Sequence, residues 1–121
     1  MFLGIDLGTS SVKIVVIDDN QKIVSQSEKP LKISSPYPLW SEQDPHQWWK
    51  KTKEALFDLD CDRKKIQAIG LSGQMHGATL IGSQDEILRA AILWNDGRSM
   101  SQCHQIEKNV KEFATITANR V

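Results

Sequence analysis

The chain begins with two segments that have the pattern of β-strands. Residues 2–7 alternate weakly between apolar and polar side chains, and residues 12–18 are rich in β-branched residues. Only the tetrapeptide GTSS lies between them, so the pattern predicts a β-hairpin. A polar turn at 18–21 is followed by residues 22–29, which are predicted to return as a third strand. The chain is therefore expected to open as a three-stranded antiparallel sheet.

A helical pattern follows an extended connection. Residues 30–40 contain three prolines, which lack a backbone N–H and interrupt regular structure. Asp44 then provides an N-cap, with Pro45 at the first helical position. The apolar stripe recurs at spacings of three and four and consists of Trp48, Thr52, Ala55, Leu56 and Leu59. This stripe predicts an amphipathic helix that packs against another element.

The second half of the chain predicts a parallel strand and a further helix. Residues 66–73 read as an apolar strand buried on both faces, and a strand, helix and strand in this order are typical of a β-α-β crossover. Residues 78–82 and 87–94 are expected to be short strands. Residues 98–113 are expected to form a second helix, with an apolar stripe of Met100, Cys103, Ile106 and Val110. The predicted fold class is α/β with a mixed sheet.

Composition narrows the range of partners and compartments. The 121 residues suffice for one compact domain, and 15 basic and 15 acidic side chains cancel. This balance gives no reason to expect nucleic acid or an anionic membrane as a partner. The first residues lack the features of a signal peptide, and no apolar run approaches the roughly 20 residues of a spanning helix, so a cytoplasmic protein is expected. Cys61 and Cys103 form no metal or redox motif and are predicted to be free thiols.

The first candidate site is the turn in the segment DLGTSSVK. Its backbone N–H and hydroxyl groups can surround phosphate oxygens, and they belong to Gly8, Thr9, Ser10 and Ser11. Asp6, just before the turn, is positioned to hold Mg²⁺ through water near those phosphates, and Lys13 can reach the same anion. An ordinary hairpin turn accounts for the same residues. The spacing matches neither the P-loop nor the Rossmann fingerprint, which disfavours both of those sites.

The second candidate site follows the predicted parallel strand. Gln74, Met75 and His76 lie at its carboxyl end, where α/β sheets place ligands. Histidine can form hydrogen bonds with a hydroxyl-rich ligand, and methionine can pack on the carbon face of that ligand. A surface histidine beside a core methionine is the alternative interpretation. His46 and His104 are remote in sequence, and no role or metal-ligand spacing is assigned to them.

The third candidate site is the segment WNDGRS. Asn95, Asp96 and Arg98 concentrate three polar groups in a turn after a strand, and Trp94 can form the wall of a sugar site. Alternatively, Asp96 is the N-cap of the helix that follows. The two interpretations are compatible.

These segments, in this order, resemble a known family. The pattern D-x-G-T-S-x-x-K, then LWSEQDP and WW, then GLSGQMHGATL and AILWNDGR resembles the amino-terminal part of the FGGY family of carbohydrate kinases. SGQMHG and LWNDGR resemble the members that use D-xylulose, and the resemblance covers nearly the whole chain. It implies an actin-like, ribonuclease-H-like ATPase fold. Residues 1–121 would form the incomplete first part of the amino-terminal domain.

The resemblance also implies an activity, cofactors and site residues. The implied reaction is the ATP-dependent phosphorylation of D-xylulose to D-xylulose 5-phosphate, with ATP and Mg²⁺ as cofactors. The implied phosphate site contains Gly8, Thr9, Ser10, Ser11 and Lys13, with Asp6 as the metal-associated carboxylate. The implied ketose site contains Gln74, Met75, His76, Trp94, Asn95, Asp96 and Arg98. Glycerol-using relatives have an Arg-Glu pair where Met75 and His76 stand, which argues for a five-carbon ketose.

The chain departs from the family in one respect. Members of the family have two actin-like domains that close around ATP and sugar, and their catalytic aspartate lies in a later segment. Phosphoryl transfer depends on positioning inside a closed, water-poor cleft, so this chain is expected to be an amino-terminal fragment that is inactive alone. The missing carboxyl-terminal half is the expected partner, and a homodimer remains open.

Three alternatives remain at this stage. The substrate can be another ketose used within the family. The chain can also be a non-catalytic module that associates with itself or with another protein through apolar surface. An actin-like ATP-dependent regulator without a sugar is compatible with the hairpin, but it leaves Met75 and His76 unexplained.

Overall fold

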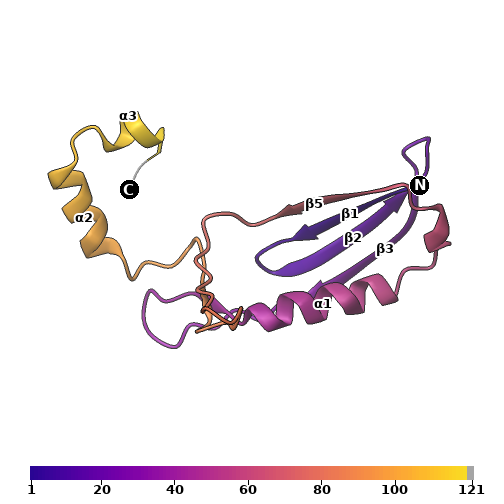
Figure 1. Cartoon of the computed structure of the whole chain (residues 1–121), viewed down its shortest axis with the longest axis horizontal. Coiled ribbons are helices and arrows are strands. Elements are labelled where there is room, and N and C mark those ends of the chain that lie inside the picture. The colour runs from indigo at the N-terminus through magenta and orange to yellow at the C-terminus, as the bar shows by residue number, and fades with distance from the viewer. Residues whose placement is uncertain (120–121) are drawn as a thin grey trace.

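A four-stranded mixed sheet with one long helix on it forms the centre of the structure (Figure 1). The computed structural model describes residues 1–119. The sheet has the order β3-β2-β1-β5 and consists of β1 (Phe2–Leu7), β2 (Ser11–Ile17), β3 (Ile23–Pro30) and β5 (Ala68–Gly73). A second sheet pairs β4 (Glu42–Gln43) with β6 (Ala91–Ile92). The helices are α1 (Pro45–Phe57), α2 (Met100–Asn109) and α3 (Phe113–Thr117), and residues Arg63–Lys65 form a short 3-10 turn.

The predicted arrangement of the sheet is confirmed. β1 and β2 are antiparallel, with Asp6 opposite Lys13, and β3 continues the antiparallel order on the far side of β2. β5 pairs with β1 in the parallel direction, with Ser72 opposite Asp6. The mixed sheet therefore contains both the three-stranded start and the β-α-β crossover, with α1 in the connection.

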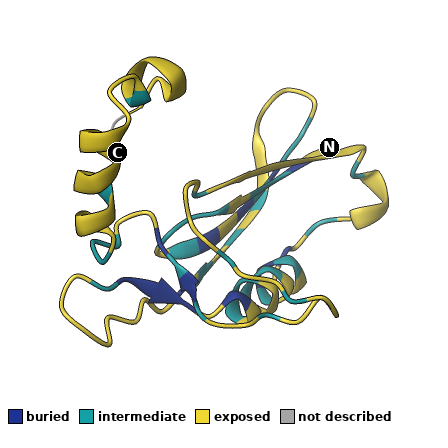
Figure 2. Cartoon of the chain, turned by 60° about the vertical axis from the view of Figure 1, so that its left-hand side comes forward, coloured by how far each residue is buried: buried dark blue, intermediate teal, exposed yellow. Residues whose placement is uncertain are grey.

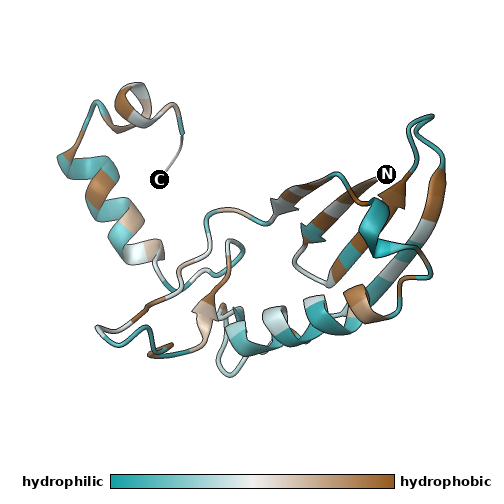
Figure 3. Cartoon of the chain, turned by 45° about the vertical axis from the view of Figure 1, so that its right-hand side comes forward, coloured by the Kyte–Doolittle hydropathy of each residue, from teal (hydrophilic) through white to brown (hydrophobic). Residues whose placement is uncertain are grey.

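The core lies between one face of the sheet and α1. Val12, Ile14 and Val16 alternate along β2 and are fully buried, and Ala55 of α1 is buried with them. The Asp44 carboxylate accepts a hydrogen bond from the His46 backbone N–H at 3.0 Å, as predicted for the N-cap of α1. Figure 3 shows hydrophobic residues along the strands of the sheet and mostly hydrophilic residues along α1. The helix thus contributes only a narrow apolar stripe.

The prediction that residues 66–73 form a strand buried on both faces is wrong. Every residue of β5 is exposed, including Ile69 at 61% and Leu71 at 79%. The strand lies at the edge of the sheet, and α1 packs on β2 and β3 instead. Within residues 1–119, no element covers β5, so its apolar side chains remain in solvent.

The predicted strands at 78–82 and 87–94 are much shorter than expected. Only Ala91–Ile92 forms a strand, and isolated bridges join Ala78 to Ile92 and Ile81 to Ile87. β6 pairs with β4, and the paired residues Gln43 and Ala91 lie 48 positions apart. A partner at that distance cannot be recognised from local pattern.

The predicted helix at 98–113 is divided into α2 and α3. α2 ends at Asn109, because the Val110 backbone leaves the helical region, with φ −123° and ψ 83°. Neither helix contains a buried residue, and both lie away from the sheet (Figures 1 and 2). No helix among residues 1–119 has both the length and the apolar character needed to cross a membrane.

Two leucines on neighbouring strands test this distribution of burial. Leu3 of β1 is 3% exposed, whereas Leu71 of β5 is 79% exposed. Leu3→Ala is expected to lower the free energy of unfolding by about 3 kcal/mol, because it leaves a cavity in the core. Leu71→Ala is expected to change it by less than about 0.5 kcal/mol. Urea denaturation of both variants measures the difference, and equal losses would contradict the burial described here.

Candidate functional site

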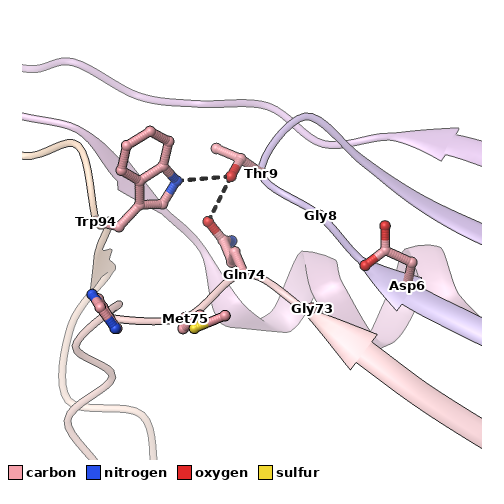
Figure 4. Close-up of a pocket in the computed structure, with 8 residues that line it drawn as sticks. Asp6, Gly8, Thr9, Gly73, Gln74, Met75 and Trp94 are labelled. Carbon is pink, nitrogen blue, oxygen red and sulfur yellow. Dashed lines mark hydrogen bonds between the residues drawn. The ribbon is translucent and has the colours of Figure 1, made fainter.

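The turn between β1 and β2 and the loop after β5 face one another across an open hollow (Figure 4). The hollow has a volume of about 440 Å³. Its lining comes from three segments distant in sequence and consists of Asp6, Gly8, Thr9, Gly73, Gln74, Met75, His76 and Trp94. Seven of these eight residues belong to the predicted phosphate and ketose sites, so the fold brings parts of both into one cavity.

The hairpin turn and the loop after β5 are held together by a close approach of their backbones. The parallel pairing continues past the end of β5, because the Gln74 backbone N–H donates to the Leu7 carbonyl at 2.9 Å. A Cβ atom added at Gly73 would lie only 3.0 Å from that same carbonyl oxygen. Glycine at position 73 therefore lets the loop leave β5 directly beside the hairpin turn. The turn itself is closed by a hydrogen bond from the Gly8 N–H to the Ser11 carbonyl at 3.0 Å.

The Thr9 hydroxyl links all three segments. It donates to the Gln74 side-chain carbonyl at 3.0 Å and accepts from the Trp94 indole N–H at 3.0 Å, as drawn in Figure 4. The indole is anchored by its nitrogen, while the residue remains 59% exposed. A ring held in this way offers its face to a ligand at little conformational cost.

Met75 and His76 are the exposed part of the loop. Met75 is 72% exposed, so the alternative of a core methionine is wrong. His76 has a φ of 63°, in the left-handed region that side chains other than glycine rarely adopt. Both residues also line an adjoining hollow of about 330 Å³, together with Leu7, Trp48 and Leu93 among others. An exposed imidazole on a backbone with positive φ suggests a functional role for His76.

The remaining residues of the predicted phosphate site lie around the hairpin. Asp6 is exposed and faces the main hollow, and Lys13 is its partner across the antiparallel pair. Lys13 lines a different hollow of about 450 Å³ over the uncovered face of the sheet, which Asp6 also borders. The Ser11 hydroxyl donates to the Glu28 carboxylate at 2.6 Å. Ser10 is exposed at the turn, and its carbonyl accepts from the Leu31 N–H at 2.8 Å.

Asp96 and Arg98, which follow Trp94 in the chain, do not line the main hollow. The Asp96 side chain is 2% exposed and accepts hydrogen bonds from Arg98 Nε at 2.7 Å and from the Ser41 N–H at 2.6 Å. The Arg98 guanidinium also contacts Glu42 at 2.8 Å and stacks 3.6 Å above the centre of the Trp40 ring. The predicted alternative of Asp96 as the N-cap is wrong, because Ser99 occupies that position.

These contacts change the acidity of the pair. The side-chain hydrogen bonds from Arg98 hold the pKa of Asp96 well below its ordinary value, against the opposing effect of burial, and backbone N–H groups of Ser41 and Arg98 add to the lowering. The pKa of Arg98 is raised, chiefly by the same bonds to Asp96. Both side chains are therefore ionised at neutral pH.

Asn95 is exposed at the tip of the same turn.

The described residues contain one carboxylate at the main hollow. No group of three or more His, Cys, Asp or Glu side chains within residues 1–119 is arranged to hold a metal ion. Asp6 by itself fits Mg²⁺ held mainly by phosphate oxygens and water, which is the ordinary arrangement at nucleotide sites. It does not fit a metal bound by protein ligands alone.

Gln43 is the main residue that the sequence did not indicate. It is 2% exposed, and its amide donates to the Thr9 carbonyl at 2.6 Å while its side-chain oxygen accepts from the Trp48 indole at 2.9 Å. Polar residues before a helix cap are usually exposed, so neither pattern nor composition singled it out. Its position in the segment SEQDP, which carries the family resemblance, was the available signal.

Comparisons with known proteins agree on one family. Residues 1–121 match the sequence model described as FGGY family of carbohydrate kinases, N-terminal domain. The chain is 46% identical over 121 residues to a xylulose kinase of Escherichia coli strain K12, an alignment that covers 98% of this chain and 25% of that protein. A xylulose kinase of Bacillus subtilis is 40% identical, with coverage of 98% and 25%.

The structural comparison gives the same result. A crystal structure of a xyloylose kinase from Brucella ovis superimposes with a TM-score of 0.92 and 45% identity, and the match covers 99% of this chain and 26% of that one. The chain therefore spans about a quarter of the length of the relatives that it matches.

The buried carboxylate of Asp96 gives a pH-dependent test. Because its pKa is lowered by folding, it stabilises the folded state above the ordinary aspartate pKa of about 3.9, and this contribution is lost as the pH falls below that value. Asp96→Asn is expected to lower the free energy of unfolding by about 1 to 2 kcal/mol near pH 7. The difference from the unmodified chain should shrink toward about pH 3. Urea denaturation at both pH values measures it, with the exposed Asp60→Asn as control; a deficit that grew on acidification would refute the assignment.

Proposed function

The chain belongs to the FGGY family of carbohydrate kinases, and on this premise we propose that its main hollow forms one wall of a site where the γ-phosphoryl group of ATP is transferred to D-xylulose. The product is D-xylulose 5-phosphate. One observation carries the proposal: the hairpin turn and the Met75–His76 loop line the same cavity. A phosphate donor and a sugar acceptor must meet in such an arrangement for transfer to occur.

The hairpin supplies the phosphate side. Thr9 and Ser10 form a tight turn whose backbone N–H groups can surround phosphate oxygens, and Lys13 adds a positive charge on the neighbouring strand. Asp6 orients the water shell of Mg²⁺, and Mg²⁺ when bound neutralises charge on the phosphates.

The loop after β5 supplies the ketose side. The exposed imidazole of His76 forms hydrogen bonds with sugar hydroxyls, while Met75 packs against the carbon backbone of the sugar. Trp94 forms the third wall, because the bond from its indole nitrogen to Thr9 orients the ring. Asp96 and Arg98 act indirectly, because their hydrogen bonds hold the turn that carries Trp94. Asn95 contacts the ligand from the tip of that turn.

The rest of the site comes from outside this chain. The proposed general base for the sugar hydroxyl and the second wall of the cleft belong to the remaining part of a longer kinase, in keeping with the quarter of its relatives that the chain spans. The chain is then the first part of an amino-terminal domain, and that remainder is its partner.

A second candidate substrate has a specific observation in its favour. A crystal structure of a gluconate kinase from Lactobacillus acidophilus superimposes with a TM-score of 0.82 and 31% identity. Kinases described with different sugar substrates therefore share the fold of this part of the chain. D-gluconate is the competing ligand to test beside D-xylulose.

Titration of the isotope-labelled chain with separate ligands tests the proposal. D-xylulose is expected to shift the amide resonances of Gln74 to Gly77 and the indole resonance of Trp94, whereas MgATP shifts those of Gly8 to Lys13. His76→Ala should weaken the response to D-xylulose about tenfold, because it removes a hydrogen bond to the ligand. NMR titration measures both effects.

The matched control is His104→Ala, since His104 is an exposed histidine on α2. It should leave the D-xylulose titration unchanged. A stronger response to D-gluconate or glycerol than to D-xylulose would overturn the assignment of the sugar. A folded spectrum that moved with none of the ligands would remove support for binding by this chain.

The isolated chain is expected to have negligible kinase activity. General base catalysis by a positioned residue contributes about 10² to 10⁴-fold, and a closed cleft contributes further. A coupled assay for ADP formation with MgATP and D-xylulose measures the rate. A rate near that of ordinary kinases, about 1 to 100 per second, would show that the general base lies within these 121 residues.

A further inference from the structure

Gln43 connects three parts of the structure from a fully buried position. It lies in β4, and its side chain contacts the hairpin through Thr9, α1 through Trp48 and the loop after β5 through Gln74. The distances are 2.6 Å to the Thr9 carbonyl, 2.9 Å to the Trp48 indole nitrogen and 3.2 Å to the Gln74 amide nitrogen. No role in ligand binding explains these contacts, because Gln43 does not line the main hollow.

The chemistry of the partners determines the orientation of the Gln43 amide. The Thr9 carbonyl can only accept, so it requires the nitrogen of Gln43 on its side. The Trp48 indole can only donate, so it requires the oxygen on the other side. A side chain with a donor at one position and an acceptor at the other satisfies both demands, and an aliphatic residue satisfies neither.

The contacts form a closed ring of three residues. Gln43 donates to the Thr9 carbonyl, the Thr9 hydroxyl donates to Gln74, and the Gln74 amide donates back to Gln43. Trp94 is attached to this ring through the Thr9 hydroxyl. A connected, partly buried network of this kind is expected to respond as a unit, because breaking one bond leaves its partners unsatisfied.

We propose that Gln43 is a positioning residue that couples the phosphate hairpin to the ketose loop, so that a change at either side is transmitted to the other. The assignment of the hairpin to phosphate and of the loop to ketose rests on the proposed function, whereas the ring of hydrogen bonds does not depend on it. The Thr9 hydroxyl carries one hydrogen, which Gln74 now accepts. A phosphate oxygen that accepts this hydrogen leaves the Gln74 side-chain carbonyl without its donor, and the attachment of Trp94 changes with it.

The test needs no ligand, since a substitution on one side of the ring is read on the other. Gln43→Met keeps the size of the side chain and removes its donor and acceptor. No hydrogen bond joins Trp94 to Gln43 among the described residues, and the two are linked through Thr9 and Gln74, so we expect the Trp94 indole N–H to respond through those residues. We expect its NMR resonance to move and its exchange with solvent to become about fivefold faster. The indoles of Trp40 and Trp49 should not change.

A second pair of variants approaches the ring from the hairpin. Thr9→Val removes the hydroxyl while keeping the shape of the side chain, and Thr9→Ser restores the hydroxyl. Thr9→Val is expected to shift the indole resonance of Trp48, because losing the hydroxyl frees Gln74, whose amide binds the same Gln43 oxygen that accepts from the Trp48 indole. Thr9→Ser should return that resonance to its original position. Gln47→Met, on the first turn of α1, serves as the matched control for Gln43→Met.

The outcomes separate coupling from general loss of stability. Faster exchange of all four indoles together with the amides of β2 would indicate destabilisation. Thr9→Val, at the half-buried hairpin turn, then decides the question. A Trp48 resonance that Thr9→Val leaves unmoved would overturn the inference, as would an unmoved Trp94 resonance in folded Gln43→Met. Because no sugar or nucleotide is present, failure here leaves the proposed kinase function untouched. Failure of the ligand titrations likewise leaves the coupling standing.

Discussion

The parallel pairing of β1 with β5 is the contact on which the candidate site depends. It places Gly73 beside Leu7 and extends through the bond from the Gln74 N–H to the Leu7 carbonyl. Residues separated by 65 positions, Thr9 and Gln74, can then exchange a side-chain hydrogen bond. Parallel strands need a long crossover, which α1 and its flanking segments provide. Loss of the register would separate the hairpin from the loop, and neither half alone forms the hollow.

The segment 41–44, just before α1, also stabilises this arrangement, and each of its residues makes a different contact. The Ser41 N–H binds Asp96, Glu42 receives Arg98, Gln43 ties the hairpin to the loop, and Asp44 caps the helix. Three of these residues, Ser41, Glu42 and Gln43, are buried, and buried polar groups are costly unless every partner is present. Their value therefore lies in specifying one geometry for the turn that carries Trp94 and for the hairpin beside it, more than in adding to overall stability.

The uncovered apolar surface of β5 agrees with a chain that spans a quarter of its relatives. The apolar pattern of residues 66–73 correctly predicted a strand but wrongly predicted that it is buried. An apolar pattern shows that a strand can be buried, but it does not show which element covers the strand. The predicted short strands at 78–94 and the single helix at 98–113 failed for a related reason. Those segments have few packing partners within residues 1–119, so weak local preferences decide where they begin and end.

Short-range patterns were enough to predict the hairpin, the capped helix and the parallel strand, because strand alternation, helix capping and glycine-rich turns act over short distances. The order of the motifs was enough to indicate the family. It also indicated which polar turns carry candidate chemistry. The folded structure was needed to show that Trp94 is bonded to Thr9, that Asp96 and Arg98 do not line the hollow, and that Gln43 is buried. The direction in which a polar side chain points depends on partners far away in the chain, and no local pattern encodes those partners.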